Sequence, residues 1–63
     1  MGDRHGEGQA LNNLGIALRE VRRFEEAITA HQDAAVIFAE MGDTYSLGVA
    51  RANLEDLRQR DEG

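Results

Sequence analysis

The sequence predicts an all-α chain of three helices, in which an antiparallel helical hairpin is followed by a third helix. Apolar residues recur at steps of three and four in three successive segments, which is the period of amphipathic helices. Proline is absent, and no segment alternates apolar and polar residues as a half-buried strand does. The chain also repeats itself with a period of forty residues.

The forty-residue repeat is visible when the chain is aligned with itself without a gap. Shifting the 63-residue chain by forty leaves 23 overlapping positions, of which seven are identical. A fixed period of this length is typical of proteins built from stacked helical units. The identical residues are Met1, Gly2, Asp3, Gly8, Ala10, Asn13 and Leu14 in the first copy, and Met41, Gly42, Asp43, Gly48, Ala50, Asn53 and Leu54 in the second.

The composition of the chain indicates which kinds of partner and which cellular compartment to expect. The net charge is −5, and the seven basic residues are all arginines. Such an acidic chain is a poor ligand for nucleic acid or for an anionic membrane surface. No apolar run approaches the ~18 residues that a membrane span needs, and there is no cysteine for a disulfide or a thiolate metal site. We therefore expect a cytoplasmic protein that has no cofactor, binds no nucleic acid and does not enter a membrane.

The first helix is expected over about residues 7–21. Its apolar residues are Ala10, Leu11, Leu14, Ala17, Leu18 and Val21. Gly15 lies in the middle of this pattern, where glycine weakens a helix by about 1 kcal/mol relative to alanine. We expect Gly15 to mark a close helix–helix crossing where no side chain fits, the alternative being a tolerated glycine.

A second helix is expected over about residues 24–40 and a third over about residues 44–59. Arg22 and Arg23 break the apolar pattern without glycine or proline, so the first turn must be short, which makes the first two helices antiparallel. Gly42 fits the left-handed position that stops a helix, and Asp43 or Thr44 caps the next one. The third helix carries an apolar stripe made of Leu47, Ala50, Leu54 and Leu57.

The spacing of large and small residues resembles that of a tetratricopeptide repeat. The residues that carry the likeness are Leu11, Leu14, Gly15, Leu18, Phe24, Ala27 and Ala34. His31 departs from the pattern, because an aromatic residue is usual there. In the third helix, Arg51, Glu55 and Arg58 stand at the places equivalent to Leu11, Gly15 and Leu18.

The forty-residue form of the repeat resembles the repeats of kinesin light chains, and still more those attached to bacterial nucleotide-binding signalling regulators. The likeness rests on the Gly-Asp pair that opens each copy and on the phrase Ala-Leu-Asn-Asn-Leu-Gly at residues 10–15. It covers about residues 2–57. It implies about one and a half repeats of a right-handed α-solenoid.

The resemblance implies a concave groove lined by the first helix of each pair, where a protein or peptide partner binds. Asn13 and Asn53 hold equivalent places, at which such asparagines grip the backbone of an extended peptide. An amide offers both a donor and an acceptor to a peptide unit. The alternative is that these asparagines bond a neighbouring helix. The other residues expected at the groove are Gln9, Asn12, Ile16, Arg19, Glu20 and Val49. Because the chain has no lysine, we do not expect a clamp for a ligand carboxylate.

No arrangement of residues predicts catalysis, a metal or a cofactor. His5 and His31 are 26 residues apart, and we expect one surface histidine and one histidine packed at the hairpin rather than two metal ligands. Ser46 has neither a strained nucleophile turn nor an oxyanion site beside it. The glycine-rich start lacks the strand and the Lys-Ser/Thr pair of a phosphate loop. The chain is therefore predicted not to be an enzyme.

A repeat and a half leaves apolar surface uncovered, because helical repeats are stabilised by stacking on their neighbours. We expect self-association through the third helix, at Leu47, Ala50, Leu54 and Leu57, with a two-fold homodimer as the commonest closed solution. A domain-swapped dimer ranks lower, because Gly42 would have to become helical.

The functional prediction is a non-catalytic protein–protein interaction module. Two alternatives stay open. One is a purely structural homo-oligomerisation unit. The other is an excised fragment of a longer array from a bacterial regulator, since Met1 aligns with Met41 and is not by itself evidence of a native start.

Overall fold

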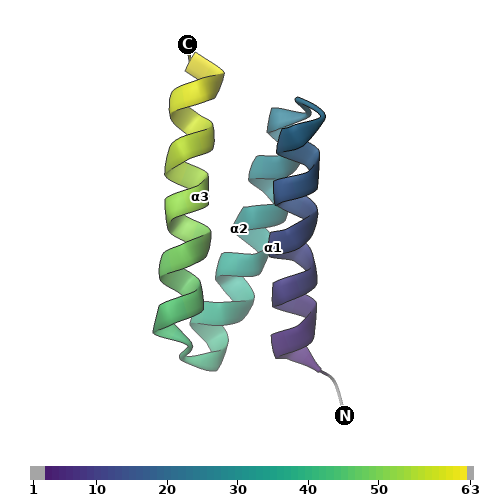
Figure 1. The fold of residues 1–63 in the computed structure, drawn as a ribbon. Coiled ribbons are helices and arrows are strands. Elements are labelled where there is room, and N and C mark those ends of the chain that lie inside the picture. The colour runs from purple at the N-terminus through teal and green to yellow at the C-terminus, as the bar shows by residue number, and fades with distance from the viewer. Residues whose placement is uncertain (1–2, 63) are drawn as a thin grey trace.

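The computed structural model describes residues 3–62 and the side chains of residues 3–59. These residues form three helices: α1 (Arg4–Glu20), α2 (Phe24–Met41) and α3 (Thr44–Glu62). The helices run up, down and up, so that α1 and α3 are parallel (Figure 1). The predicted all-α architecture is confirmed, and no described residue lies in a strand. Met1 and Gly2, which open the first copy of the repeat, lie outside the described residues.

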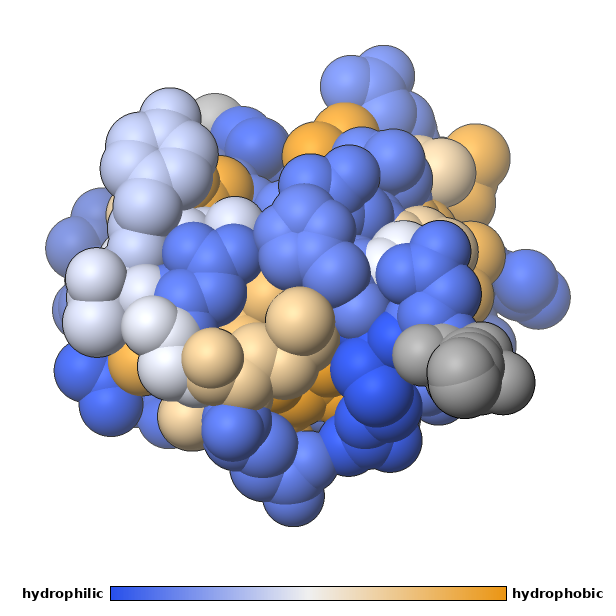
Figure 2. Space-filling model, turned by 90° about the horizontal axis from the view of Figure 1, so that it is seen from below, coloured by the Kyte–Doolittle hydropathy of each residue, from blue (hydrophilic) through white to orange (hydrophobic). Residues whose placement is uncertain are grey.

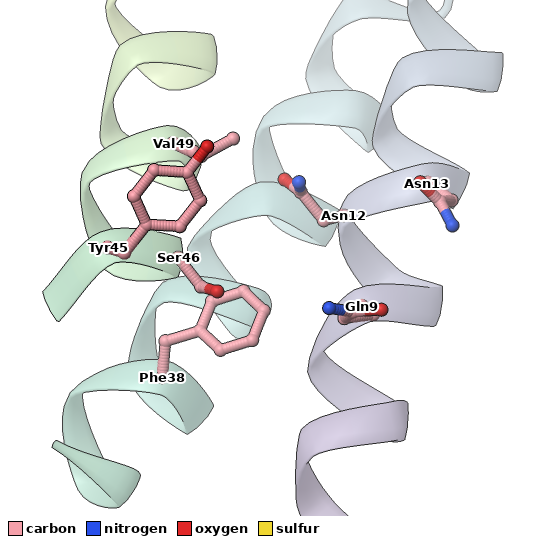
Figure 3. A pocket seen from close by; sticks show the side chains of 7 residues that line it. All are labelled: Gln9, Asn12, Asn13, Phe38, Tyr45, Ser46 and Val49. Carbon is pink, nitrogen blue, oxygen red and sulfur yellow. The ribbon is translucent and has the colours of Figure 1, made fainter. Parts of the chain in front are cut away.

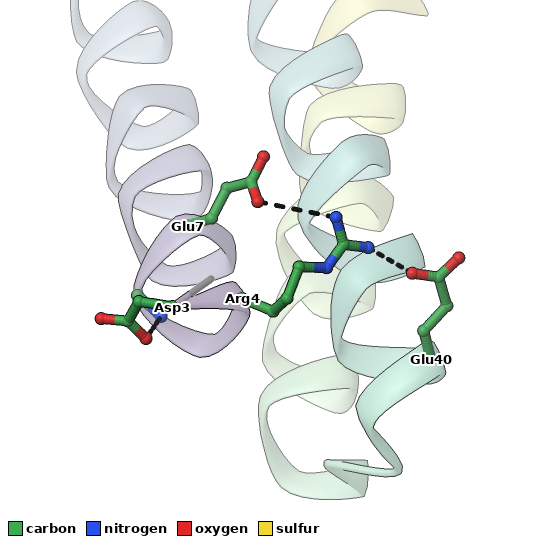
Figure 4. Close-up of polar contacts among 5 residues, drawn as sticks. Asp3, Arg4, Glu7 and Glu40 are labelled. Carbon is green, nitrogen blue, oxygen red and sulfur yellow. Dashed lines mark hydrogen bonds and ion pairs between the residues drawn. The ribbon is translucent and has the colours of Figure 1, made fainter. Parts of the chain in front are cut away.

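The start of α1 is three residues earlier than predicted, and it has a local cause. Asp3 Oδ1 accepts a hydrogen bond of 2.9 Å from the Gly6 N–H, which satisfies one of the free N–H groups of the first turn. Arg4, the first helical residue, contacts the carboxylates of Glu7 and Glu40 (Figure 4). The contact with Glu40 connects the start of α1 to the last turn of α2. The other predicted ends are close, α2 being one residue longer and α3 three residues longer than expected.

Each turn contains one residue with a left-handed backbone. Arg22 has a φ of 66° although it is not glycine, and its guanidinium lies 5.9 Å from the centroid of the Phe24 ring. Gly42 has a φ of 74°, which confirms the predicted helix stop. Asp43 then caps α3 by accepting a hydrogen bond of 3.1 Å from the Ser46 N–H.

The buried core lies mostly on α2, which packs against both α1 and α3. Phe38 and Leu57 are the largest buried apolar side chains. Four of the seven buried apolar residues in the described part are alanines, so the core is thin for a chain of this size. The seven are Ala27, Ala30, Ala34, Ile37, Phe38, Ala50 and Leu57.

The contact of α1 with α2 is made close by two buried glycines. A Cβ atom at Gly15 would lie 2.5 Å from His31 Nε2, and one at Gly8 would lie 2.8 Å from Phe38 Cε1. The close approach expected at Gly15 is confirmed, and the neighbour is the ring of His31. The predicted apolar pattern of the first helix is only partly buried: Leu11 and Leu18 are half-buried, and the exposed members are Ala10, Leu14, Ala17 and Val21.

One end of the molecule shows how hydrophilic and apolar side chains share the surface. Seen from the end at which α1 and α3 begin, hydrophilic side chains surround smaller apolar areas (Figure 2). The large apolar residues that are exposed are Leu14, Ile16, Val21, Val36, Met41, Tyr45 and Val49. No helix among residues 3–62 combines the length and the apolar character needed to cross a membrane.

Candidate functional site

A groove lies between α1 and α3, and it contains a cavity of about 300 Å³. Helix α1 supplies three amide side chains, α3 supplies two hydroxyls and an aliphatic side chain, and α2 supplies one aromatic ring. Asn12 points toward α3, whereas Asn13 points away from it (Figure 3). The lining residues are Gln9, Asn12, Asn13, Phe38, Tyr45, Ser46 and Val49.

Polar side chains connect α1 to α3 at three levels of this groove. The α1 members are seven residues apart, so they share one face of the helix. Both helices pack mainly on α2, and these polar contacts link them directly across the groove. The contacts are His5 Nε2 to Asp43 Oδ2 at 3.1 Å, Asn53 Nδ2 to Asn12 Oδ1 at 3.4 Å, and Arg19 Nη2 to Asp56 Oδ2 at 2.8 Å.

His31 is the buried polar centre beneath the groove, with 1% of its surface exposed. Its Nδ1 lies 2.7 Å from Asn12 Oδ1, and because a carbonyl oxygen only accepts, Nδ1–H is the donor. Asn12 Oδ1 therefore accepts from His31 of α2 and from Asn53 of α3, which joins all three helices. Burial, and then the positive charge of Arg19, lower the pKa of His31 from its ordinary value of 6.5, so the neutral ring is favoured.

Asp43 holds a negative charge at the start of α3. The Ser46 hydroxyl and then the Ser46 N–H donate to it, and with a smaller contribution from His5 they lower the pKa of Asp43 from its ordinary value of 3.8. The pair of His5 and Asp43 thus stands at one end of the groove, and the pair of Arg19 and Asp56 stands further along it. Between them the lining residues carry no formal charge.

Four of the residues expected at the groove line the cavity, namely Gln9, Asn12, Asn13 and Val49. Asn53 instead donates to Asn12, which is the arrangement of the alternative reading, a bond to a neighbouring helix. Arg19 lies beside the groove in its pair with Asp56. Ile16 and Glu20 are exposed on α1 and do not line the cavity.

Three lining residues were not anticipated: Phe38, Tyr45 and Ser46. Tyr45 could have been predicted from the sequence. It is the only tyrosine and lies four residues before Val49, which places both on one helix face. It is 81% exposed. Phe38 lies within the second predicted helix, and nothing in its position along the chain indicates that its ring reaches the groove.

The apolar stripe of the third helix, which was expected to mediate self-association, packs largely against the rest of the same chain. Ala50 and Leu57 have no exposed surface, and Leu47 and Leu54 are half-buried. Ala50 belongs to the core cluster with Ala34 and Phe38 of α2. A contact between copies through the whole stripe would therefore require α3 to leave α2. Leu54 lines a second cavity of about 290 Å³ together with Arg51, Glu55 and Arg58.

The two histidines lie in separate contacts, one with Asp43 and one with Asn12. In the part of the chain that the structure describes, no group of three or more His, Asp or Glu side chains is placed to hold a metal ion. Comparison with known proteins gives no relative: the chain matches no protein-family model, no curated protein and no solved structure.

Proposed function

We propose that the chain is a non-catalytic protein-binding module, built as one and a half tetratricopeptide-like repeats, whose groove between α1 and α3 takes an extended segment of a partner protein. The observation that carries this proposal is the lining of the groove. Amide side chains of α1, with Asn12 pointing toward α3, share an open cavity with hydroxyl and aliphatic side chains of α3. A peptide unit presents one N–H donor and one C=O acceptor, and amide side chains match both.

The chemistry of the lining favours an uncharged segment with an apolar or aromatic side chain. The titratable residues at the groove are paired with each other, His5 with Asp43 and Arg19 with Asp56. A ligand charge would therefore find no unpaired partner among these four residues. Exposed tyrosine is enriched at protein interfaces, and Tyr45 stands beside Val49 on α3 as a platform for such a side chain.

The proposal is tested by selecting linear peptides from a displayed random library on the full chain and titrating a selected peptide against the protein in solution. The chain has one tyrosine and no tryptophan, so with a peptide that lacks both, the emission of Tyr45 reports occupancy of the groove. Val49→Arg places a bulky charge in the groove at a residue that is 37% exposed. We expect it to weaken binding at least about tenfold, the loss of one apolar contact plus an unpaired charge.

Val36→Arg is the matched control, because Val36 is the same residue type, is 57% exposed on α2 and does not line the cavity. Binding that weakens equally in both variants, or a library that yields no groove ligand, would contradict the proposal. Asn13 lines the cavity, so Asn13→Ala is expected to weaken peptide binding. Asn53→Ala removes the Asn53–Asn12 contact, so it is expected to lower the stability of the fold.

A further inference from the structure

A row of exposed apolar residues runs along the outer side of α1. It consists of Ala10, Leu14 and Ala17, which lie on one face of the helix, and of Val21, the residue that caps its C-terminal end. Leu14 is 49% exposed and Val21 is 65% exposed, and both alanines are exposed as well. We call this row the α1 stripe. None of its residues lines the groove, so it is a separate surface.

The internal repeat identifies the α1 stripe as a packing face. In the forty-residue alignment, Ala10 corresponds to Ala50, and Ala17 corresponds to Leu57. Ala50 and Leu57 are completely buried, Ala50 in the cluster that it forms with α2. Leu14 corresponds to Leu54, which is half-buried. At the two alanine positions of the α1 stripe, α3 thus packs with the face that α1 leaves open. Four of the seven buried apolar residues are alanines, so the chain buries little apolar area by itself. A partner that covers the α1 stripe would add substantially to that area.

The opposite side of the molecule is not apolar. The far side of α3 carries Arg51, Glu55 and Arg58 around Leu54, at the second cavity. A head-to-tail stack of two copies would press the α1 stripe against these charges and would remove them from water, which is unfavourable without partners. A two-fold contact instead places the same patch of each copy against itself, so that apolar residues meet apolar residues.

The charges at the two ends of α1 suit such a contact. Glu7 lies in the first turn, and Arg22 and Arg23 follow the last turn. In an antiparallel pair of α1 helices, Glu7 of one copy approaches Arg22 and Arg23 of the other. Within the chain Glu7 already lies 3.6 Å from Arg4, and Arg23 lies 3.3 Å from Glu26, so the contacts between copies would share these charges with existing ion pairs. The small side chains of Ala10 and Ala17 allow the two helices to approach closely.

We propose that the α1 stripe is a self-association surface, on which the α1 stripe of a second copy packs antiparallel about a two-fold axis between Leu14 and Ala17. The proposal is independent of peptide binding in the groove. A helix of this length spans about 25 Å at a rise of 1.5 Å per residue. The contact is therefore smaller than a standard interface of about 800 Å² per partner, and we expect a weak dimer with a dissociation constant on the order of 100 μM.

Cross-linking gives the sharpest test, because the chain has no cysteine and a single introduced thiol reports only on contacts between copies. Ala17→Cys lies close to the proposed axis, whereas Val36→Cys lies on α2, away from the α1 stripe. Under mild oxidation at about the expected dissociation constant, we expect Ala17→Cys to form a disulfide-linked dimer at least about tenfold faster than Val36→Cys. Equal rates for the two variants would overturn the proposal.

Sedimentation equilibrium of the full chain provides the second measurement. Leu14→Glu is expected to weaken the dimer at least about tenfold, with an unchanged helical circular dichroism spectrum and unchanged peptide binding in the groove. Leu54→Glu, on the charged side of α3, is expected to leave the dimer intact. A chain that stays monomeric to about 1 mM, or a dimer that only Leu54→Glu disrupts, would overturn the proposal. The proposal would also be overturned if the chain were a monomer whose α1 stripe binds an added peptide of residues 24–41, because the stripe would then be a binding surface for a helix like α2.

Discussion

Two glycines inside helices provide a direct test of the packing between α1 and α2. Gly15 and Gly48 each lie in the interior of a helix, where replacing glycine by alanine favours the helix by about 1 kcal/mol. Their surroundings differ. A Cβ at Gly48 would meet nothing within 4 Å, whereas a Cβ at Gly15 would lie 2.5 Å from His31 Nε2 and 2.7 Å from two ring carbons. The same substitution should therefore have opposite effects at the two sites.

The magnitude at Gly15 follows from what His31 would have to do. The ring is buried and is held by its 2.7 Å hydrogen bond to Asn12, so it has little room to retreat. Overpacking a buried site costs about 1–3 kcal/mol, and the strained hydrogen bond contributes about 0.5–1.5 kcal/mol more. After the gain of about 1 kcal/mol in helix propensity, Gly15→Ala should destabilise the fold by roughly 0.5–3.5 kcal/mol, whereas Gly48→Ala should stabilise it by about 1 kcal/mol.

The assay is urea unfolding followed by far-ultraviolet circular dichroism, with all variants at one fixed low protein concentration so that association is constant. The double variant Gly15→Ala with His31→Ala should be more stable than the sum of the two single effects predicts, because the ring that meets the new methyl group is gone. We expect an interaction energy of about 0.5–3 kcal/mol in this cycle. A Gly15→Ala variant as stable as Gly48→Ala, or a cycle that is additive, would refute the close contact of Gly15 with His31.

The remaining predictions concern the polar centre and the cap of α3. The pKa of His31 is lowered in the folded chain, so the unfolded chain binds more protons below pH 6.5. The free energy of unfolding should therefore decrease as the pH is lowered below 6.5, by no more than about 1.4 kcal/mol per pH unit. His31→Gln should remove this pH dependence from unfolding curves measured at several pH values. Asn12→Ala leaves the buried His31 donor without its acceptor and should lower the free energy of unfolding by about 1–3 kcal/mol, more than Asn13→Ala does. The pKa of Asp43 is also lowered, so its cap stabilises the fold above pH 3.8 and is lost as the pH falls through the lowered value. Asp43→Ala should lower the free energy of unfolding at neutral pH in the same assay.

The elements of the fold followed from local chemistry that the sequence displays directly. The left-handed stop at Gly42 and the cap by Asp43 depend on residues that adjoin each other in the chain, and both are present as expected. The contact face of α1 did not follow in the same way. Periodicity shows which residues share a helix face, but not which part of that face a neighbour covers. Leu14 and Val21 therefore fitted the pattern and yet lie exposed.

Some residues that line the cavity were named from the internal repeat and the family resemblance, and those whose place depends on how the helices pack were not. Gln9 and Asn13 were assigned to the groove by the family resemblance, and both line the cavity. Phe38 could not be assigned, because its ring reaches the cavity only once α2 is packed between α1 and α3. Asn53 was assigned by equivalence to Asn13, but α1 stands beside α3 and offers it the carbonyl of Asn12. No helix of the described chain stands in the same way beside the outer side of α1, so the two equivalent asparagines differ in their surroundings.

The hydrogen bonds of Asn12 also limit how a partner can bind in the groove. Its carbonyl oxygen already accepts from His31 Nδ1 and from Asn53 Nδ2, and a carbonyl oxygen has two lone pairs. Only the amide hydrogens of Asn12 remain for a ligand, so a bound peptide should present a carbonyl oxygen there rather than an N–H. Asn13 is exposed and lies next to this position, and it offers both an acceptor and a donor to the rest of the peptide. In the proposed complex, Asn12 would therefore hold one carbonyl group of the bound segment, and the orientation of Asn12 depends on its hydrogen bond with the buried His31.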